Sequence, residues 1–310
     1  MTTSIAGVTT PNRNQAYLSA AMFRTHRRSG VQVENLVPKG TPADQGAALL
    51  QYIREGSRWC DDIVDGHLGA TVDTEQRQAN VDRRGFVTVS PRFRPVLGLL
   101  AFAIGPSADM LTTLADLSGA DVQEDAISVP VFARALMTSS QGPIQFGSMA
   151  APYDRALCRY TYVNGFPVTT ITADIDLGAT SIAVADTTGI VAGMTQLTVY
   201  DGRNTFTFIA SSVSTADSGG LGTGAGVVGC AAAPVSVKIS DPWDPPMVSG
   251  MPAHMIDAVV LATRALIKET PRGTTSSTGG RTQQQSKAPP AGDDFAEAER
   301  LLRTYMVVTR

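Results

Sequence analysis

The sequence predicts an α+β fold in which helices from both ends of the chain form a small bundle, with inserted antiparallel β domains and an extended C-terminal arm. Three observations support this prediction. Apolar residues recur at helical spacing from Pro42 to Gly66 and again from Pro252 to Lys268. Between these segments the period changes to that of β-strands punctuated by glycine and proline. Residues 272–292 are too polar and too rich in Gly, Ser, Gln and Pro to build a core.

The first long helix carries its own start signal. Thr41 is a predicted N-cap, Pro42 occupies the first helical position, and Asp44 makes the first turn acidic. Its apolar face recurs at three- and four-residue steps, as Leu49, Tyr52, Ile53, Cys60, Ile63 and Val64. A shorter helix is expected within residues 12–26. Since an amphipathic helix needs a partner for its apolar face, we expect the helix from Pro42 to pack against the helix from Pro252.

The middle of the chain reads as β structure. Strands are predicted within residues 85–105, 125–137 and 156–165. In the last of these, Cys158, Tyr160 and Tyr162 face one way and their neighbours the other. Residues 168–215 predict a small antiparallel unit, in which Asp201 and Gly202 form a hairpin turn.

These signals divide the chain into five parts. They are an N-terminal helical part (1–82), a β-rich part (83–167), an inserted small antiparallel β module (168–240), the closing helix of the bundle (241–270), and a flexible linker with a C-terminal helix and strand arm (271–310). In the arm, Asp293 and Asp294 are expected to cap a helix, and the last six residues resemble a strand.

Composition limits the function classes. The net charge of -3 argues against nucleic-acid binding over the whole surface. Cys60, Cys158 and Cys230 lie too far apart for a zinc quartet or a secreted disulfide framework. The N-terminus lacks the pattern of a signal peptide, and the most apolar run, Pro95 to Gly105, is about half of what a membrane helix needs. We therefore expect a soluble, intracellular protein without a membrane partner.

One glycine pattern has the spacing of a dinucleotide-binding loop: Gly224-x-Gly226-x-x-Gly229. That function requires a strand before the glycines and a helix after them. Here a polar loop precedes them, and Pro234 opposes a continuing helix. The pattern is therefore interpreted as a mobile loop that closes the β unit, and no cofactor is expected.

An acidic cluster, Asp61-Asp62-x-x-Asp65, resembles the magnesium motif of prenyl-transferring and terpene-cyclising enzymes. Those enzymes need a second acidic cluster on a facing helix, whereas the helix from Pro252 offers only Asp257 and Glu269. The three histidines lack a second ligand at metal spacing, and no catalytic motif is present. We interpret the cluster as an exposed acidic face, and we expect neither a metal site nor an enzyme.

Parts of the chain resemble a known family. The stretches "AYLSAAMF" and "GAALLQYIREGSRWCDDIVD" resemble the two N-terminal helices of head-to-tail connector (adaptor) proteins of tailed bacteriophages, with Ile53, Gly56, Ser57 and Trp59 at matching positions. "VDTEQRQANVDRRGFVTVSPRFRPVL" is similar to a segment of actinobacteriophage members, and "PAHMIDAVVLATRALI" to their closing helix. "LGATSIAVADTTGIVAGMTQLTVYDG" resembles a β module of phage structural proteins.

The resemblance implies a structural role in the neck of a virion that is assembled in the host cytoplasm. It implies a ring of twelve subunits below the portal protein, a lower surface for the next neck or tail-completion protein, and a lumen through which DNA passes without specific binding. Burial between subunits would stabilise a chain with little core per segment. The alternatives are a tail or baseplate β protein, or an enzyme that uses the Asp61 cluster or the Gly224 loop.

The C-terminal arm is the expected portal-binding element, with its helix in a groove and its last residues added to a sheet edge. The alternative is that this helix folds back on its own subunit. The predicted partner-binding residues are Phe295, Leu301, Leu302, Tyr305, Met306, Val307 and Val308.

Overall fold

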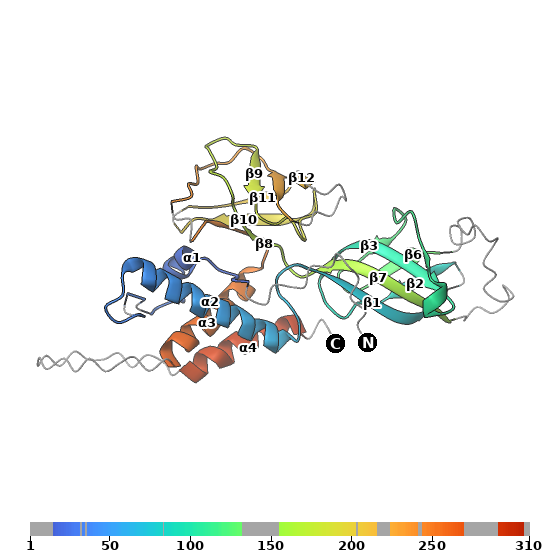
Figure 1. Ribbon diagram of the computed structural model, residues 1–310, viewed down its shortest axis with the longest axis horizontal. Coiled ribbons are helices and arrows are strands. Elements are labelled where there is room, and N and C mark those ends of the chain that lie inside the picture. Colours follow the sequence, from blue (N-terminus) through green and yellow to red (C-terminus); the bar gives the residue numbers. More distant parts are fainter. Residues whose placement is uncertain are drawn as a thin grey trace, which may run out of the picture.

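The computed structural model describes residues 15–131, 155–215, 224–240, 244–269 and 291–306, apart from residues 32, 35, 83 and 203. Within them the chain is mixed α+β, which confirms the predicted class. Buried side chains gather in three cores, one around the helices and one inside each of two β units. Figure 1 shows the helices and the first β unit at opposite ends of the long axis, with the second β unit beside the helices. No helix in this described part is both long and apolar enough to cross a membrane.

Helix α2 begins where local signals place it, whereas α4 begins at Ala291, so Asp293 and Asp294 lie in its first turn instead of capping it. Thr41 caps α2 in a capping box with Asp44, whose carboxylate accepts the Thr41 backbone N–H at 2.7 Å. Ser19 caps α1 through its side-chain hydroxyl, so the helix expected within residues 12–26 begins only after that residue. Residues 12–14 of that expectation lie outside the described part. The helices are α1 (Ala20–Thr25), α2 (Pro42–Val64), α3 (Ala253–Glu269) and α4 (Ala291–Met306).

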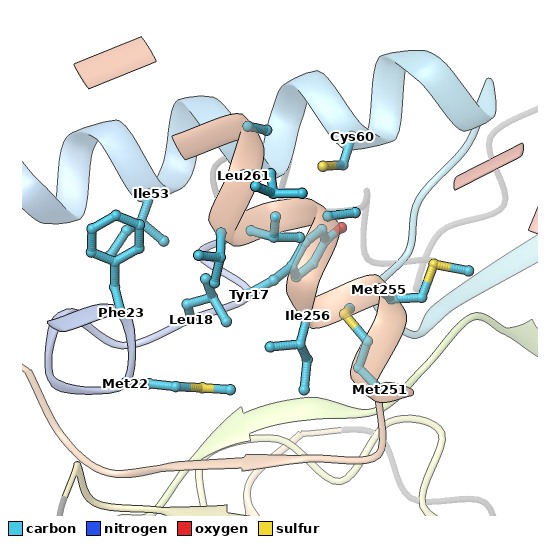
Figure 2. Close-up of a cluster of buried hydrophobic side chains, with 14 of the residues drawn as sticks. Tyr17, Leu18, Met22, Phe23, Ile53, Cys60, Met251, Met255, Ile256 and Leu261 are labelled. Atoms are coloured by element: carbon cyan, nitrogen blue, oxygen red, sulfur yellow. The ribbon is translucent and has the colours of Figure 1, made fainter. Parts of the chain in front are cut away.

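Helix α3 is the centre of the helical layer and is buried on nearly every side. It packs against α2, as the apolar faces of the two helices predict. The closest approach is at Gly56, where an added Cβ would lie 2.4 Å from Thr263 Oγ1, so the crossing requires glycine. Figure 2 shows side chains of α1, α2, α3 and the segment before α1 meeting in one cluster. Its labelled members are Tyr17, Leu18, Met22, Phe23, Ile53, Cys60, Met251, Met255, Ile256 and Leu261.

The first β unit encloses a core between two antiparallel sheets, with strand orders β1-β7-β3-β4 and β2-β6-β5. The alternation predicted for β7 is confirmed, because Cys158, Tyr160 and Tyr162 are fully buried while their neighbours Arg159 and Thr161 are not. The strands are β1 (Thr71–Asn80), β2 (Phe86–Val89), β3 (Val96–Gly105), β4 (Thr112–Thr113), β5 (Asp121–Val122), β6 (Ile127–Pro130) and β7 (Arg155–Asn164), and a short 3-10 helix (Ala108–Met110) follows β3.

Strand β1 corrects the sequence analysis, which placed residues up to 82 in a helical part. It pairs with β7 along its whole length. The sequence hides this strand because its inward positions are mostly polar. Glu75 is one of them, and its carboxylate accepts hydrogen bonds from the hydroxyls of Tyr160 (3.1 Å) and Tyr162 (2.5 Å). Hydrogen-bonded polar groups thus replace the apolar alternation by which strands are usually recognised.

The second β unit has sheets ordered β11-β10-β14-β8 and β12-β13-β9. The predicted hairpin is confirmed, with Asp201 and Gly202 in the turn between β10 and β11. The unit extends beyond the predicted limit of 240, because β14 pairs with both β10 and β8. The strands are β8 (Val168–Thr170), β9 (Ser181–Val184), β10 (Gln196–Tyr200), β11 (Thr205–Ile209), β12 (Ser212–Thr215), β13 (Gly226–Gly229) and β14 (Met247–Ser249).

The chain enters and leaves the first β unit through one narrow connection, here called the waist (residues 68–70 and 165–167). The Phe166 N–H donates to the Leu68 carbonyl at 2.7 Å, and the Ala70 N–H donates to the Phe166 carbonyl at 2.8 Å. Gly165 has φ 85°, and an added Cβ would lie 2.4 Å from the Gly69 carbonyl oxygen. A larger residue would therefore separate the two segments.

Candidate interaction surface

Helix α4 is held to α3 by a buried carboxylate. Asp294 is 3% exposed, and it accepts hydrogen bonds from Arg264 Nε at 2.9 Å, from Arg264 Nη2, and from Lys268 Nζ at 2.7 Å. Burial alone would raise the pKa of the Asp294 carboxyl, but the hydrogen bonds and charges of the two cations outweigh it and lower that pKa. The Arg264 guanidinium also donates to the Arg28 carbonyl at 2.7 Å, so the same group ties down the segment after α1.

The inner face of α4 is apolar and contacts the helical core. The ring of Phe295 lies against that of Trp59 on α2, with centroids 4.9 Å apart. Ala298 and Leu302 are fully buried, one turn apart. Helix α4 therefore fills a groove formed by α2 and α3, here called the α4 groove.

The outer face of α4 is charged. Arg300 pairs with Glu297 at 2.7 Å, and Arg303 pairs with Glu299 at 2.6 Å, both at helical spacing. Both arginines are more than half exposed. Exposed ion pairs of this kind contribute little to the stability of the fold. Because the two arginines are exposed, this face is available to solvent or to a partner.

The predicted partner-binding residues divide into two groups. Phe295, Leu301 and Leu302 contact the core of their own subunit, which is the arrangement of the alternative in which the helix folds back. Tyr305 and Met306 belong to the last turn of α4 rather than to a strand. Val307 and Val308 lie outside the described residues. Portal binding by the arm stays a prediction, and the apolar face of α4 can contribute to it only by leaving the α4 groove.

The acidic cluster on α2 is not a uniformly exposed face. Asp61 is buried at 8% exposure, and its carboxylate accepts hydrogen bonds from the Tyr17 hydroxyl (2.8 Å) and the Leu68 N–H (3.0 Å). The ring of His67 lies 3.2 Å from the same carboxylate. Burial, together with the Asp61 charge, raises the pKa of the Tyr17 hydroxyl. Asp61 thus joins α2 to the segment before α1 and to the waist, a role that the sequence analysis missed.

The other two carboxylates of the cluster point elsewhere. Asp62 is exposed, and Asp65 ends α2 in the left-handed region with φ 53°. Asp65 accepts a hydrogen bond from Arg92 Nη2 at 3.0 Å across to the first β unit. Within the described ranges, no three His, Cys, Asp or Glu side chains are grouped so as to hold a metal ion.

Two of the three glycines of the dinucleotide-like pattern, Gly226 and Gly229, lie in a strand, which corrects the expected mobile loop, and Gly224 lies in the bend before it. Gly226–Gly229 is β13, the middle strand of its sheet, and it pairs with β12 and β9. An added Cβ on Gly226 would lie 2.3 Å from the Ser214 carbonyl oxygen, and one on Gly229 would lie 2.3 Å from Ser212 Oγ. Close strand packing requires these two glycines. No helix directly follows β13 in the described residues: the chain continues through bends to Val237, which forms an isolated bridge with Ile175.

A cleft of about 410 Å³ lies between the helical layer and the second β unit. Asp244 is among its lining residues, and its carboxylate accepts the backbone N–H groups of Ala20 (2.7 Å) and Ala21 (2.8 Å). Asp244 lies just before β14, which belongs to the second β unit. Asp244 therefore holds the start of α1 against the second β unit.

Comparisons of the chain with protein-family models, with curated proteins and with solved structures return no match.

Proposed function

We propose that this protein is a head-to-tail connector of a tailed-phage virion, which forms a ring of twelve copies below the portal and lets DNA pass through its lumen. The observation that carries the proposal is the layer made by α2, α3 and α4. These helices come from distant parts of the chain, and two β units project from them (Figure 1). The packing of α3 against α2 is the part of this arrangement that is implied by the resemblance of the N-terminal and closing helices to connector proteins.

The distribution of surfaces also supports a ring. A closed ring with heterologous contacts needs two different complementary patches on each subunit. The charged outer face of α4 and the two β units are chemically different surfaces on separate sides of the helical layer. A net charge of -3 suits a lumen that DNA passes without being retained.

The alternatives have less support. A tail or baseplate β protein has no need of the helical layer, whose core is built from all four helices. The enzyme alternative rested on the Asp61 cluster and on the Gly224 pattern. The carboxylate of Asp61 is occupied by protein donors, and the glycines beyond Gly224 are explained by strand packing.

The test is electron microscopy of the purified protein, alone and mixed with the portal protein of the same virus, together with mass measurement in solution. We expect rings of twelve copies, either alone or stacked on portal rings. A chain that stays a single copy in both samples, and does not sediment with the portal, contradicts the proposal.

The arm is tested separately by deleting residues 307–310. This deletion removes the proposed strand and keeps every described contact of α4. Weaker attachment to the portal with an unchanged melting temperature is expected. Unaltered attachment would remove Val307 and Val308 from the portal-binding surface while leaving the connector proposal in place.

A further inference from the structure

The connection between α3 and α4 is much longer than their geometry requires. Asp294, in the first turn of α4, bonds to Lys268, in the last turn of α3, so the end of one helix lies beside the start of the next. Antiparallel helices in this position are usually joined by about 2–8 residues. Here 21 residues, 270–290, separate Glu269 from Ala291.

The contacts of α4 are those of a separable interface with strong anchors. They consist of an aromatic pair (Trp59 and Phe295), a buried carboxylate with two cationic partners (Asp294), and small and branched apolar side chains (Ala298 and Leu302). Aromatic and arginine anchors of this kind carry most of the energy in protein interfaces. Most of the stability of a helix in a protein comes from packing of its apolar face, so α4 depends on an α4 groove to remain folded.

The groove does not need to belong to the same copy. The Gly, Ser, Gln and Pro content of this connection predicts a flexible chain. A flexible chain of this length has a root-mean-square span of about 25 Å and a fully extended span of about 70 Å. Equivalent grooves on adjacent copies lie about one subunit width apart, roughly 50 Å for a compact chain of this size, which is within the extended span. Each contact of α4 with this groove forms equally well between two copies, because the same residues meet.

We propose that α4 is exchanged between neighbouring copies, so that the α4 groove of each subunit binds α4 of the next. This inference rests on the proposed function, since it needs copies held side by side. Each subunit then both gives and receives a helix, which is a heterologous contact that closes in a ring. Neighbours in a ring hold their grooves at a high effective concentration for α4. Exchange uses the residues that already contact α4, so it requires no additional interface.

The test uses two charge variants that are mixed. In variant one, Asp294→Arg places a third cation beside Arg264 and Lys268. In variant two, Arg264→Glu with Lys268→Glu leaves Asp294 without its cations. Neither variant can bind its own α4 as the native chain does. In a mixture, however, α4 of variant two and the groove of variant one are both native at these positions.

Docking of α4 is measured by limited trypsin digestion, which cleaves at Arg300 and Arg303 when the helix is undocked. Variant two is labelled with ¹⁵N, so that mass spectrometry distinguishes its α4. We expect that adding variant one raises protection of the labelled helix to the wild-type level. Absence of protection in the mixture overturns the exchange, provided that the chain carrying all three substitutions protects its own α4.

A second measurement avoids the buried charges, in case either variant fails to fold. A chain with Trp59→Cys and Phe295→Cys is treated with a short bismaleimide and run on a denaturing gel. Exchange predicts covalent multimers, whereas linkage only within single chains overturns it. Rings in the microscope with within-chain linkage would reject the exchange and keep the connector proposal. A single-copy protein would reject both.

Discussion

Replacing Gly56 with alanine tests the closest approach in the helical layer. The new Cβ would lie 2.4 Å from Thr263 Oγ1 and 2.9 Å from the Thr263 backbone nitrogen. Rotation of the Thr263 side chain relieves only the first contact, because the second is to backbone. Helices α2 and α3 must therefore move apart, which weakens the packing of the core around α3.

The magnitude follows from two opposing effects. Overpacking of this kind costs about 1–3 kcal/mol, whereas alanine is better than glycine in a helix by about 1 kcal/mol. Gly46→Ala, in the same helix, is the matched control, because its added Cβ would meet nothing closer than an Arg24 side-chain atom at 3.9 Å. The control should gain about 1 kcal/mol, and the difference between the two variants isolates an overpacking cost of about 1–3 kcal/mol.

The assay is urea denaturation followed by the helical circular dichroism signal, with the wild type, Gly56→Ala and Gly46→Ala measured in parallel. We expect Gly46→Ala to unfold at the highest urea concentration and Gly56→Ala at the lowest. If Gly56→Ala is as stable as Gly46→Ala, the two helices do not approach as described, and the argument for a glycine-dependent crossing is refuted.

Two further predictions concern buried polar groups. Asp61→Asn should destabilise the protein by about 1–3 kcal/mol in urea denaturation, because an NH2 donor replaces one of the two buried acceptor oxygens and the remaining hydrogen bonds lose the carboxylate charge, whereas the exposed control Asp62→Asn should change little. Stabilisation of the wild type by added magnesium would contradict the structural role of Asp61. Burial, with the Glu75 charge, raises the pKa of the Tyr160 and Tyr162 hydroxyls above the ordinary 10.0. Their protonated form stabilises the fold fully below about pH 10, and this contribution is lost as the pH rises further. Urea midpoints should therefore fall above about pH 10, less steeply in Tyr162→Phe, and equal slopes would exclude this residue as the cause.

Local signals in the sequence were sufficient for the elements with strong capping or turn chemistry. Thr41 with Asp44 located the start of α2, and Asp201 with Gly202 located the β10–β11 hairpin. In both cases neighbouring residues determine the structure, so no knowledge of distant contacts was needed. The alternation around Tyr160 succeeded because alternate residues of β7 from Ala156 to Tyr162 are buried and carry largely apolar side chains.

Features that depend on distant partners could not be predicted in this way. Glu75 of β1 points inward, and this position is explained only by the two tyrosine hydroxyls of β7 that donate hydrogen bonds to its carboxylate. The glycines of β13 imitate a nucleotide-binding pattern, because close backbone contact requires glycine in both settings. Asp294 was assigned a capping role that any acid in a first turn could fill. The available clue was the pair Arg264 and Lys268, which are four residues apart on α3.

The waist has a consequence for how such a gene can change. Because the segments at Leu68–Ala70 and Gly165–Pro167 are hydrogen-bonded to each other, the two ends of the first β unit are adjacent in space. Coding sequence between them can be lost, acquired or replaced by an unrelated module in one recombination event, without displacing the flanking chain. Related proteins can therefore vary the first β unit, and the contacts it makes, independently of the rest of the chain.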